Sequence, residues 1–139
     1  MKTDPGTDRT PGTGPATRYV AVVDDDRSVG IALSRLLRAS GFEAKPFVSA
    51  ANFLESLPDH MPDCLVLDVQ MLGMNGLELQ QRLKEVAASL PVIMMTGRDE
   101  ASIRAICLAM GVSTYLRKPI IDDDLLDAIE RAITGRAMR

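Results

Sequence analysis

The sequence predicts an α/β fold: a five-stranded parallel sheet in the order 2-1-3-4-5, doubly wound with five helices. Short, continuously apolar segments alternate five times with segments whose apolar residues recur at helical spacing. The apolar segments lack the in-and-out alternation of half-exposed strands, which indicates a parallel sheet buried on both faces. Short connections and right-handed crossovers leave few topologies, and this strand order suits five strands.

Each expected strand is followed by a helix. The strands are residues 19–23, 42–47, 64–67, 91–95 and 112–116. The helices are marked by apolar stripes within residues 31–37, 53–57, 77–86, 103–110 and 125–133. The second unit is the weakest, because Pro46 interrupts its strand, although Ser49 offers its helix an N-cap. Gly41 and Gly111 are expected to end the first and fourth helices.

Composition narrows the class of protein. The 16 basic and 19 acidic residues are interspersed and give a net charge of −3, so we expect no direct nucleic-acid binding by this chain. No apolar run approaches the roughly 20 residues of a membrane span, and the N-terminus does not resemble a signal peptide. We therefore expect a cytoplasmic protein without membrane contact. Cys64 and Cys107 lie in apolar stretches without metal-type spacing, which favours buried thiols, and His60 is expected at the surface.

The chain is expected to contain one folded domain and a tail. Residues 1–17 are rich in Thr, Pro and Gly and nearly free of large apolar side chains, so they cannot bury enough surface to offset the entropy of ordering. We interpret them as a flexible N-terminal tail. Residues 18–136 form the domain.

Acidic residues follow two of the expected strands. Asp24 and Asp25 follow the first and Asp68 follows the third. The carboxyl ends of parallel strands meet at one edge of the sheet, where open α/β folds bind ligands. Carboxylates packed there repel one another unless a cation or proton intervenes, and an all-oxygen set favours Mg²⁺. A helix N-cap explains only part of this run, and we assign that role to Asp26.

Asp68 also suits a nucleophile. An acid that ends an apolar strand is partly desolvated, which a turn cap explains poorly. It would attack a phosphoryl group to form an aspartyl phosphate, with Mg²⁺ offsetting the charge repulsion. Thr96 and Lys118, after the fourth and fifth strands, would supply a hydroxyl donor and an ammonium to the phosphoryl oxygens. Either residue alone is common at such positions, so their joint order and spacing carry the prediction.

With these motifs, the sequence resembles the receiver domains of bacterial two-component response regulators, which have the flavodoxin-like fold of CheY. The resemblance covers residues 18 to about 135. It rests on V-V-D-D-D (22–26), L-V-L-D-V-Q-M-L-G-M-N-G (65–76), M-M-T-G (94–97) and Y-L-R-K-P (115–119). Other details are most similar to receivers of the FixJ type, which normally precede a helix-turn-helix output domain. The resemblance thus implies transcriptional control through a separate DNA-binding domain, or a single-domain regulator that binds partners.

The resemblance implies a role for each site residue. Asp68 would accept the phosphoryl group from a sensor histidine kinase. Mg²⁺ would be held by Asp24, Asp25, Asp68 and the main-chain carbonyl of Gln70. The protein would be a phospho-accepting switch and not an enzyme, with at most slow self-phosphorylation and autodephosphorylation.

The resemblance also implies a switch. Thr96 and Lys118 would sense the phosphoryl group, Tyr115 would turn inward with Thr96, and the bond before Pro119 would be cis. The output face would be residues 99–136, through which we expect a phosphorylation-dependent homodimer or partner binding. Four side chains are candidates for that face, although helical spacing alone does not separate them from core: Ile103, Ile106, Met110 and Tyr115.

One departure and three alternatives stay open. Leu72 stands where most receivers have proline, which puts metal affinity and phosphate lifetime in question. A degenerate receiver that binds proteins without phosphorylation is the nearest alternative, although all five site positions are present. An aspartyl-phosphate phosphohydrolase usually needs an acid at the position of Gln70. A nucleotide-binding module would want a Gly-rich loop after the first strand, where this chain has D-D-D-R-S.

Overall fold

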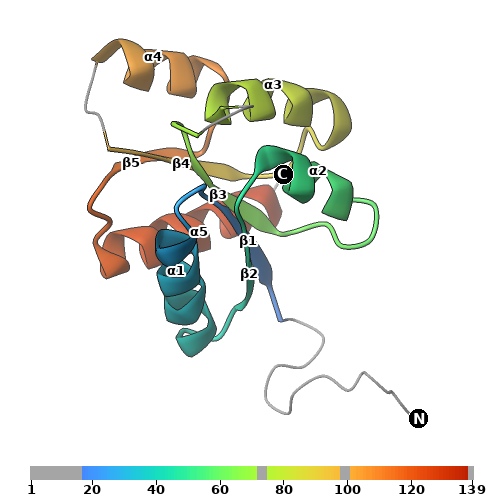
Figure 1. The fold of residues 1–139 in the computed structure, drawn as a ribbon, viewed down its shortest axis with the longest axis vertical. Coiled ribbons are helices and arrows are strands. Elements are labelled where there is room, and N and C mark those ends of the chain that lie inside the picture. Colours follow the sequence, from blue (N-terminus) through green and yellow to red (C-terminus); the bar gives the residue numbers. More distant parts are fainter. Residues whose placement is uncertain (1–16, 72–74, 98–100, 138–139) are drawn as a thin grey trace.

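The computed structural model describes residues 17–71, 75–97 and 101–137 (Figure 1). Strand and helix alternate throughout, and all five strands lie in one parallel sheet of order β2-β1-β3-β4-β5. The strands are β1 (Tyr19–Val23), β2 (Glu43–Phe47), β3 (Cys64–Asp68), β4 (Val92–Thr96) and β5 (Thr114–Arg117). The helices are α1 (Arg27–Ala39), α2 (Ala50–Ser56), α3 (Gly76–Val86), α4 (Ala101–Ala109) and α5 (Asp122–Ala137). The predicted fold class and strand order are confirmed.

The sheet separates two hydrophobic cores. Helices α1 and α5 cover one face, and α2, α3 and α4 cover the other (Figure 1). Alternate residues of each central strand enter opposite cores: Val22 packs with Leu37, whereas Val23 packs with Phe53 and Leu79. Because both faces are covered, the central strands are apolar without alternation, which is the pattern seen in the sequence.

Local signals in the sequence fix most helix ends. Asp26 caps α1, its side chain accepting hydrogen bonds from the Ser28 and Val29 amides, and Ser49 caps α2 in the same way. Gly41 and Gly111 follow α1 and α4 with φ of 97° and 87°, a backbone region that favours glycine. These four predictions are confirmed.

The main difference from the sequence prediction is at β5. This strand begins at Thr114, two residues later than expected, because the Val112 amide donates to the Cys107 carbonyl oxygen at 3.4 Å and so belongs to the turn that ends α4. Phe42 likewise lies outside β2, since its amide donates to the Leu37 carbonyl oxygen at 3.0 Å. Both amides therefore form hydrogen bonds at the ends of helices and not within the sheet.

Several predictions concern residues outside the described ranges: the tail at 1–16, Leu72, and positions 99 and 100 of the expected output face. Within the described ranges no helix has both the length and the apolar character needed to cross a membrane. Cys64 and Cys107 are both buried, as the sequence predicted, and they lie in opposite cores.

Candidate functional site

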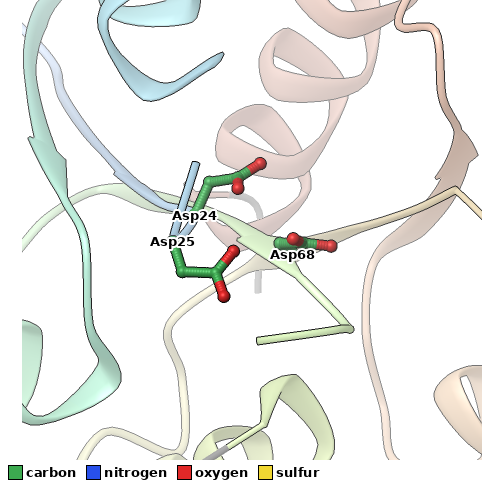
Figure 2. Close-up of side chains that lie close together, drawn as sticks. All are labelled: Asp24, Asp25 and Asp68. Atoms are coloured by element: carbon green, nitrogen blue, oxygen red, sulfur yellow. The ribbon is translucent and has the colours of Figure 1, made fainter. Parts of the chain in front are cut away.

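The acids converge at the carboxyl edge of the sheet. Asp24 and Asp25 follow β1, and Asp68 is the last residue of the neighbouring strand β3; Figure 2 shows the three side chains close together. Asp24 is 1% exposed and Asp68 4% exposed, whereas Asp25 is exposed. Each acid offers one carboxylate oxygen, and these oxygens lie within 4.8 Å of one another. The sheet therefore concentrates negative charge in a partly buried place, which is costly unless cations balance it.

Lys118 supplies part of that balance. It directly follows β5, and its backbone amide donates to the Thr96 carbonyl oxygen at 2.7 Å. Its ammonium lies 2.9 Å from Asp24 Oδ2 and 3.4 Å from Asp68 Oδ2. The Lys118-Pro119 peptide bond is cis, as the resemblance implied. Within the described part of the chain, this one ammonium is shared by two buried carboxylates, so Asp24 and Asp68 together carry more negative charge than Lys118 balances.

Backbone hydrogen bonds hold the acids in place. Asp24 Oδ1 accepts from the Asp26 amide at 2.9 Å, and Asp68 Oδ1 accepts from the Gln70 amide at 3.2 Å. Each buried carboxylate thus keeps one oxygen on a backbone amide and turns the other toward Lys118. The carboxylate orientations are fixed by the chain itself before any ligand arrives.

The surroundings change the acidity of Asp68. Burial is the largest cause, and together with the charge of Asp24 it raises the pKa of Asp68 from 3.8 to about 6, although Lys118 and the Gln70 amide act in the opposite direction. Burial alone would lower the pKa of Lys118, but its hydrogen bond to Asp24 and the charges of both acids raise that pKa overall. Lys118 therefore stays charged, and the ionised form of Asp68 is disfavoured until more positive charge is present.

The donor set fits a hard divalent cation. Oxygen ligands without histidine or thiolate are those that Mg²⁺ prefers, and its charge would offset the excess left by Lys118. A cavity of about 470 Å³ lies beside the exposed acid of the three, Asp25. Asp25 and Gln70 form part of its polar wall, and Met71, Leu77 and Ile103 are among its apolar lining.

The structure places the two other predicted positions as follows. Thr96 is the fully buried last residue of β4 and directly follows Met95, which pairs with Asp68 of β3. Tyr115 is the second residue of β5 and is half-buried; like Ile103, it packs against the core on the face covered by α2, α3 and α4. Thr96 therefore joins the acids and Lys118 at the carboxyl edge, whereas Tyr115 lies earlier in its strand and packs against the core.

The predicted output face is only partly exposed. Of its four candidate side chains, Ile106 is 46% exposed, and the other three are half-buried. Leu108, which the sequence argument did not single out, is 50% exposed and lines a shallow pocket with Ala101, Arg104 and Ala105. The sequence does hint at this surface, because residues 101–109 include only one charged residue. The structure leaves most of this apolar helix exposed, since only Cys107 is fully buried.

Comparison with known proteins identifies the family. Residues 20–130 match the response regulator receiver domain, so the chain belongs to the family of receiver domains, which are the phospho-accepting switches of two-component signalling. The family predicted from the sequence motifs is thereby confirmed.

Three relatives place the chain within that family. FixJ, a transcriptional regulatory protein of Bradyrhizobium diazoefficiens, is 36% identical over 115 residues, which cover 83% of this chain and 56% of FixJ. TdiR, a transcriptional regulatory protein of Thauera aromatica, is 38% identical over 82% of this chain and 50% of its own length. The crystal structure of a response regulator receiver protein from Burkholderia phymatum is 43% identical with a TM-score of 0.76, covering 85% of this chain and 96% of that one. The chain thus spans about half the length of the curated relatives it matches.

Proposed function

We propose that Asp68 is the phospho-acceptor of this receiver domain and takes its phosphoryl group from a sensor histidine kinase. The observation that carries the proposal is a buried carboxylate with a raised pKa, beside an ammonium and two further acids, at the open edge of the sheet. An Asp68 oxygen would bond to phosphorus as the phosphorus–nitrogen bond of the kinase's phosphohistidine breaks and its electron pair returns to the imidazole. The gel experiment described below tests this assignment.

Four groups would hold Mg²⁺: the carboxylates of Asp24, Asp25 and Asp68, and the main-chain carbonyl of Gln70. The ion would offset the repulsion between Asp68 and the incoming phosphoryl oxygens. Asp24 also holds the Lys118 ammonium at 2.9 Å, which keeps that cation at the site. The phosphoryl group would then replace the Asp68 carboxylate as the second anionic partner of Lys118.

Thr96 and Lys118 would sense the phosphoryl group once it is attached. Thr96 ends β4 and Lys118 directly follows the neighbouring strand β5, and the Lys118 amide donates a hydrogen bond to the Thr96 carbonyl oxygen. Tyr115 of β5 and Ile103 of α4 pack against the same hydrophobic core, and through this core Tyr115 would relay the change toward α4. Phosphorylation can shift this equilibrium only by its differential affinity for the two arrangements.

The output would be read on the described part of the 99–136 face, where Ile106 and Leu108 are exposed. We propose a phosphorylation-dependent homodimer there, transcriptional control through a separate DNA-binding domain as in the transcriptional regulators it resembles, and a cytoplasmic location. Self-phosphorylation and autodephosphorylation would be slow. Size exclusion with beryllofluoride and Mg²⁺ tests the dimer: wild type should elute earlier and Leu108→Asp should not, whereas equal elution of both would contradict it.

A gel that resolves phosphorylated protein tests the acceptor. After incubation with acetyl phosphate and Mg²⁺, wild type should show a shifted band, and Asp68→Asn should show none. Asp59→Asn, which changes an exposed acid outside the site, is the matched control and should label like wild type. Equal labelling of wild type and Asp68→Asn would show that another residue accepts the phosphoryl group.

A further inference from the structure

Gly76 begins α3 against the end of β3, the strand that carries Asp68. Its amide donates to the Val69 carbonyl oxygen at 2.9 Å. A methyl group on its α-carbon would lie 2.5 Å from the Asp68 carbonyl oxygen and 2.7 Å from Val69 Cα. Both distances are far below van der Waals contact, and both neighbours are main-chain atoms that cannot rotate away. Helix α3 can approach the acceptor strand this closely only because residue 76 has no side chain.

Other contacts hold both helix α3 and the end of strand β3 in place. Helix α3 is anchored by the fully buried Leu79 and by a capping box, in which Asn75 and Glu78 exchange two hydrogen bonds of 2.9 Å. On the other side, the Val69 amide donates to the Met95 carbonyl oxygen at 2.8 Å and continues the β3–β4 ladder. A side chain at position 76 would therefore displace the main chain at the end of β3.

We propose that Gly76 is a positioning residue for phosphoryl transfer. By letting α3 close on β3, it sets the Asp68 carboxylate and the main chain at Gln70 relative to Asp25. It contacts neither the metal nor the phosphoryl group and acts only through these neighbours. Helix stability does not explain a glycine here, since alanine is the better helix former.

The inference rests on the proposed function and makes a prediction about metal affinity. Asp68 and Gln70 supply two of the four groups proposed to hold Mg²⁺, and both belong to the segment that Gly76 supports. Mg²⁺ requires near-ideal octahedral geometry. Displacing this support should therefore lower Mg²⁺ affinity by about tenfold, the usual scale for groups that orient metal ligands.

The test compares wild type, Gly76→Ala and Gly135→Ala. Gly135 lies in α5, and a methyl group built on it meets nothing within 4 Å, so its variant is the matched control. Thermal unfolding in EDTA reports stability, and the further rise in Tm with graded Mg²⁺ reports affinity in the folded state. We expect Gly76→Ala to lose about tenfold in Mg²⁺ affinity and to label more slowly with acetyl phosphate at saturating Mg²⁺, whereas Gly135→Ala keeps wild-type values.

A core variant separates positioning from general stability. Leu79→Ala removes core atoms from α3 but keeps both Gly76 and the capping box that holds the first turn of α3 beside β3, so it should lower Tm in EDTA and leave Mg²⁺ affinity unchanged. If Gly76→Ala behaves like Leu79→Ala, or labels and binds Mg²⁺ like wild type, the positioning role is overturned.

Two further outcomes are decisive. If Gly76→Ala does not fold, Asn75→Ala takes its place: it removes the capping box without adding volume, a loss of about threefold in Mg²⁺ affinity would support the role, and an unchanged affinity would overturn it. If wild type itself neither binds Mg²⁺ nor labels on Asp68, the proposed function fails, and the positioning role fails with it.

Discussion

The two edges of the sheet carry ion pairs of similar length in opposite settings. Near the amino ends of the strands, Arg18 and Glu130 form two hydrogen bonds of 2.8 Å, and their side chains are 37% and 50% exposed. At the carboxyl edge, Lys118 lies 2.9 Å from Asp24, whose side chain is 0% exposed. The first pair is balanced and solvated, whereas the second has a partly exposed Lys118 that is shared by two buried acids, Asp24 and Asp68. Burial with unbalanced charge, more than ion pairing itself, marks the functional edge.

Other groups at the amino edge fit a structural role. Tyr19 stacks on His60 with ring centroids 4.1 Å apart, and its amide donates to Asp63 at 2.8 Å. Burial, with a contribution from the charge of Glu43, raises the pKa of Tyr19 to about 12, so the phenol stays neutral at physiological pH. The amino edge is thus held by stacking and hydrogen bonds, whereas the carboxyl edge gathers buried charged groups.

The largest effect on stability is expected when Lys118, the cation at the carboxyl edge, is replaced. Lys118→Met leaves Asp24 and Asp68 without their ammonium, and loss of one partner from such a site should lower the free energy of unfolding by about 2–3 kcal/mol, less than for a fully buried pair because Lys118 is partly exposed. Urea unfolding in EDTA measures this loss, and Mg²⁺ should restore part of it. If Lys118→Met lost no more unfolding free energy than Arg18→Met, the proposed difference between the two edges would be contradicted.

A smaller effect of opposite sign is expected from Asp68→Asn. Because the folded-state pKa of Asp68 is raised, its contribution to stability is fully present below pH 3.8 and is lost as the pH rises through about 6. Asp68→Asn should therefore stabilise the metal-free protein at neutral pH by about 1–2 kcal/mol, with the gain fading in acid. Urea unfolding across this pH range measures it, and a gain that is constant with pH would argue against the raised pKa.

The smallest effect is expected at the amino edge. Arg18→Met removes an exposed pair but keeps an apolar cover over Phe42, whose ring lies 4.9 Å from the guanidinium carbon of Arg18. We expect a loss of about 0.5 kcal/mol that shrinks at high salt. Labelling by acetyl phosphate should be unchanged, and slower labelling would mean that the two edges are coupled.

Much of this molecule follows from local signals in the sequence. Strand order came from continuous apolar runs and short connections, and helix starts came from cap residues such as Asp26 and Ser49. The gathering of Asp24, Asp68 and Lys118 followed because parallel strands bring their carboxyl ends to one edge. These features depend on neighbours in sequence or on topology alone.

The remaining features depend on tertiary distances that no local pattern encodes. His60 is exposed, as expected, but its stacking on Tyr19 joins residues 41 positions apart. The exposure of Leu108 depends on how α4 is rotated against the sheet, and helical spacing does not determine that rotation. The close approach of Gly76 to Asp68 likewise emerges only when α3 and β3 are packed together.

Mapping the labelled residue tests the central claim most directly. Sodium borohydride reduces an aspartyl phosphate to homoserine, which peptide mass spectrometry identifies by position. After treatment with acetyl phosphate and Mg²⁺, we predict conversion at Asp68 and at no other acid, including the neighbouring Asp25. Conversion at Asp25, or a labelled protein in which Asp68 remains unchanged, would contradict the account.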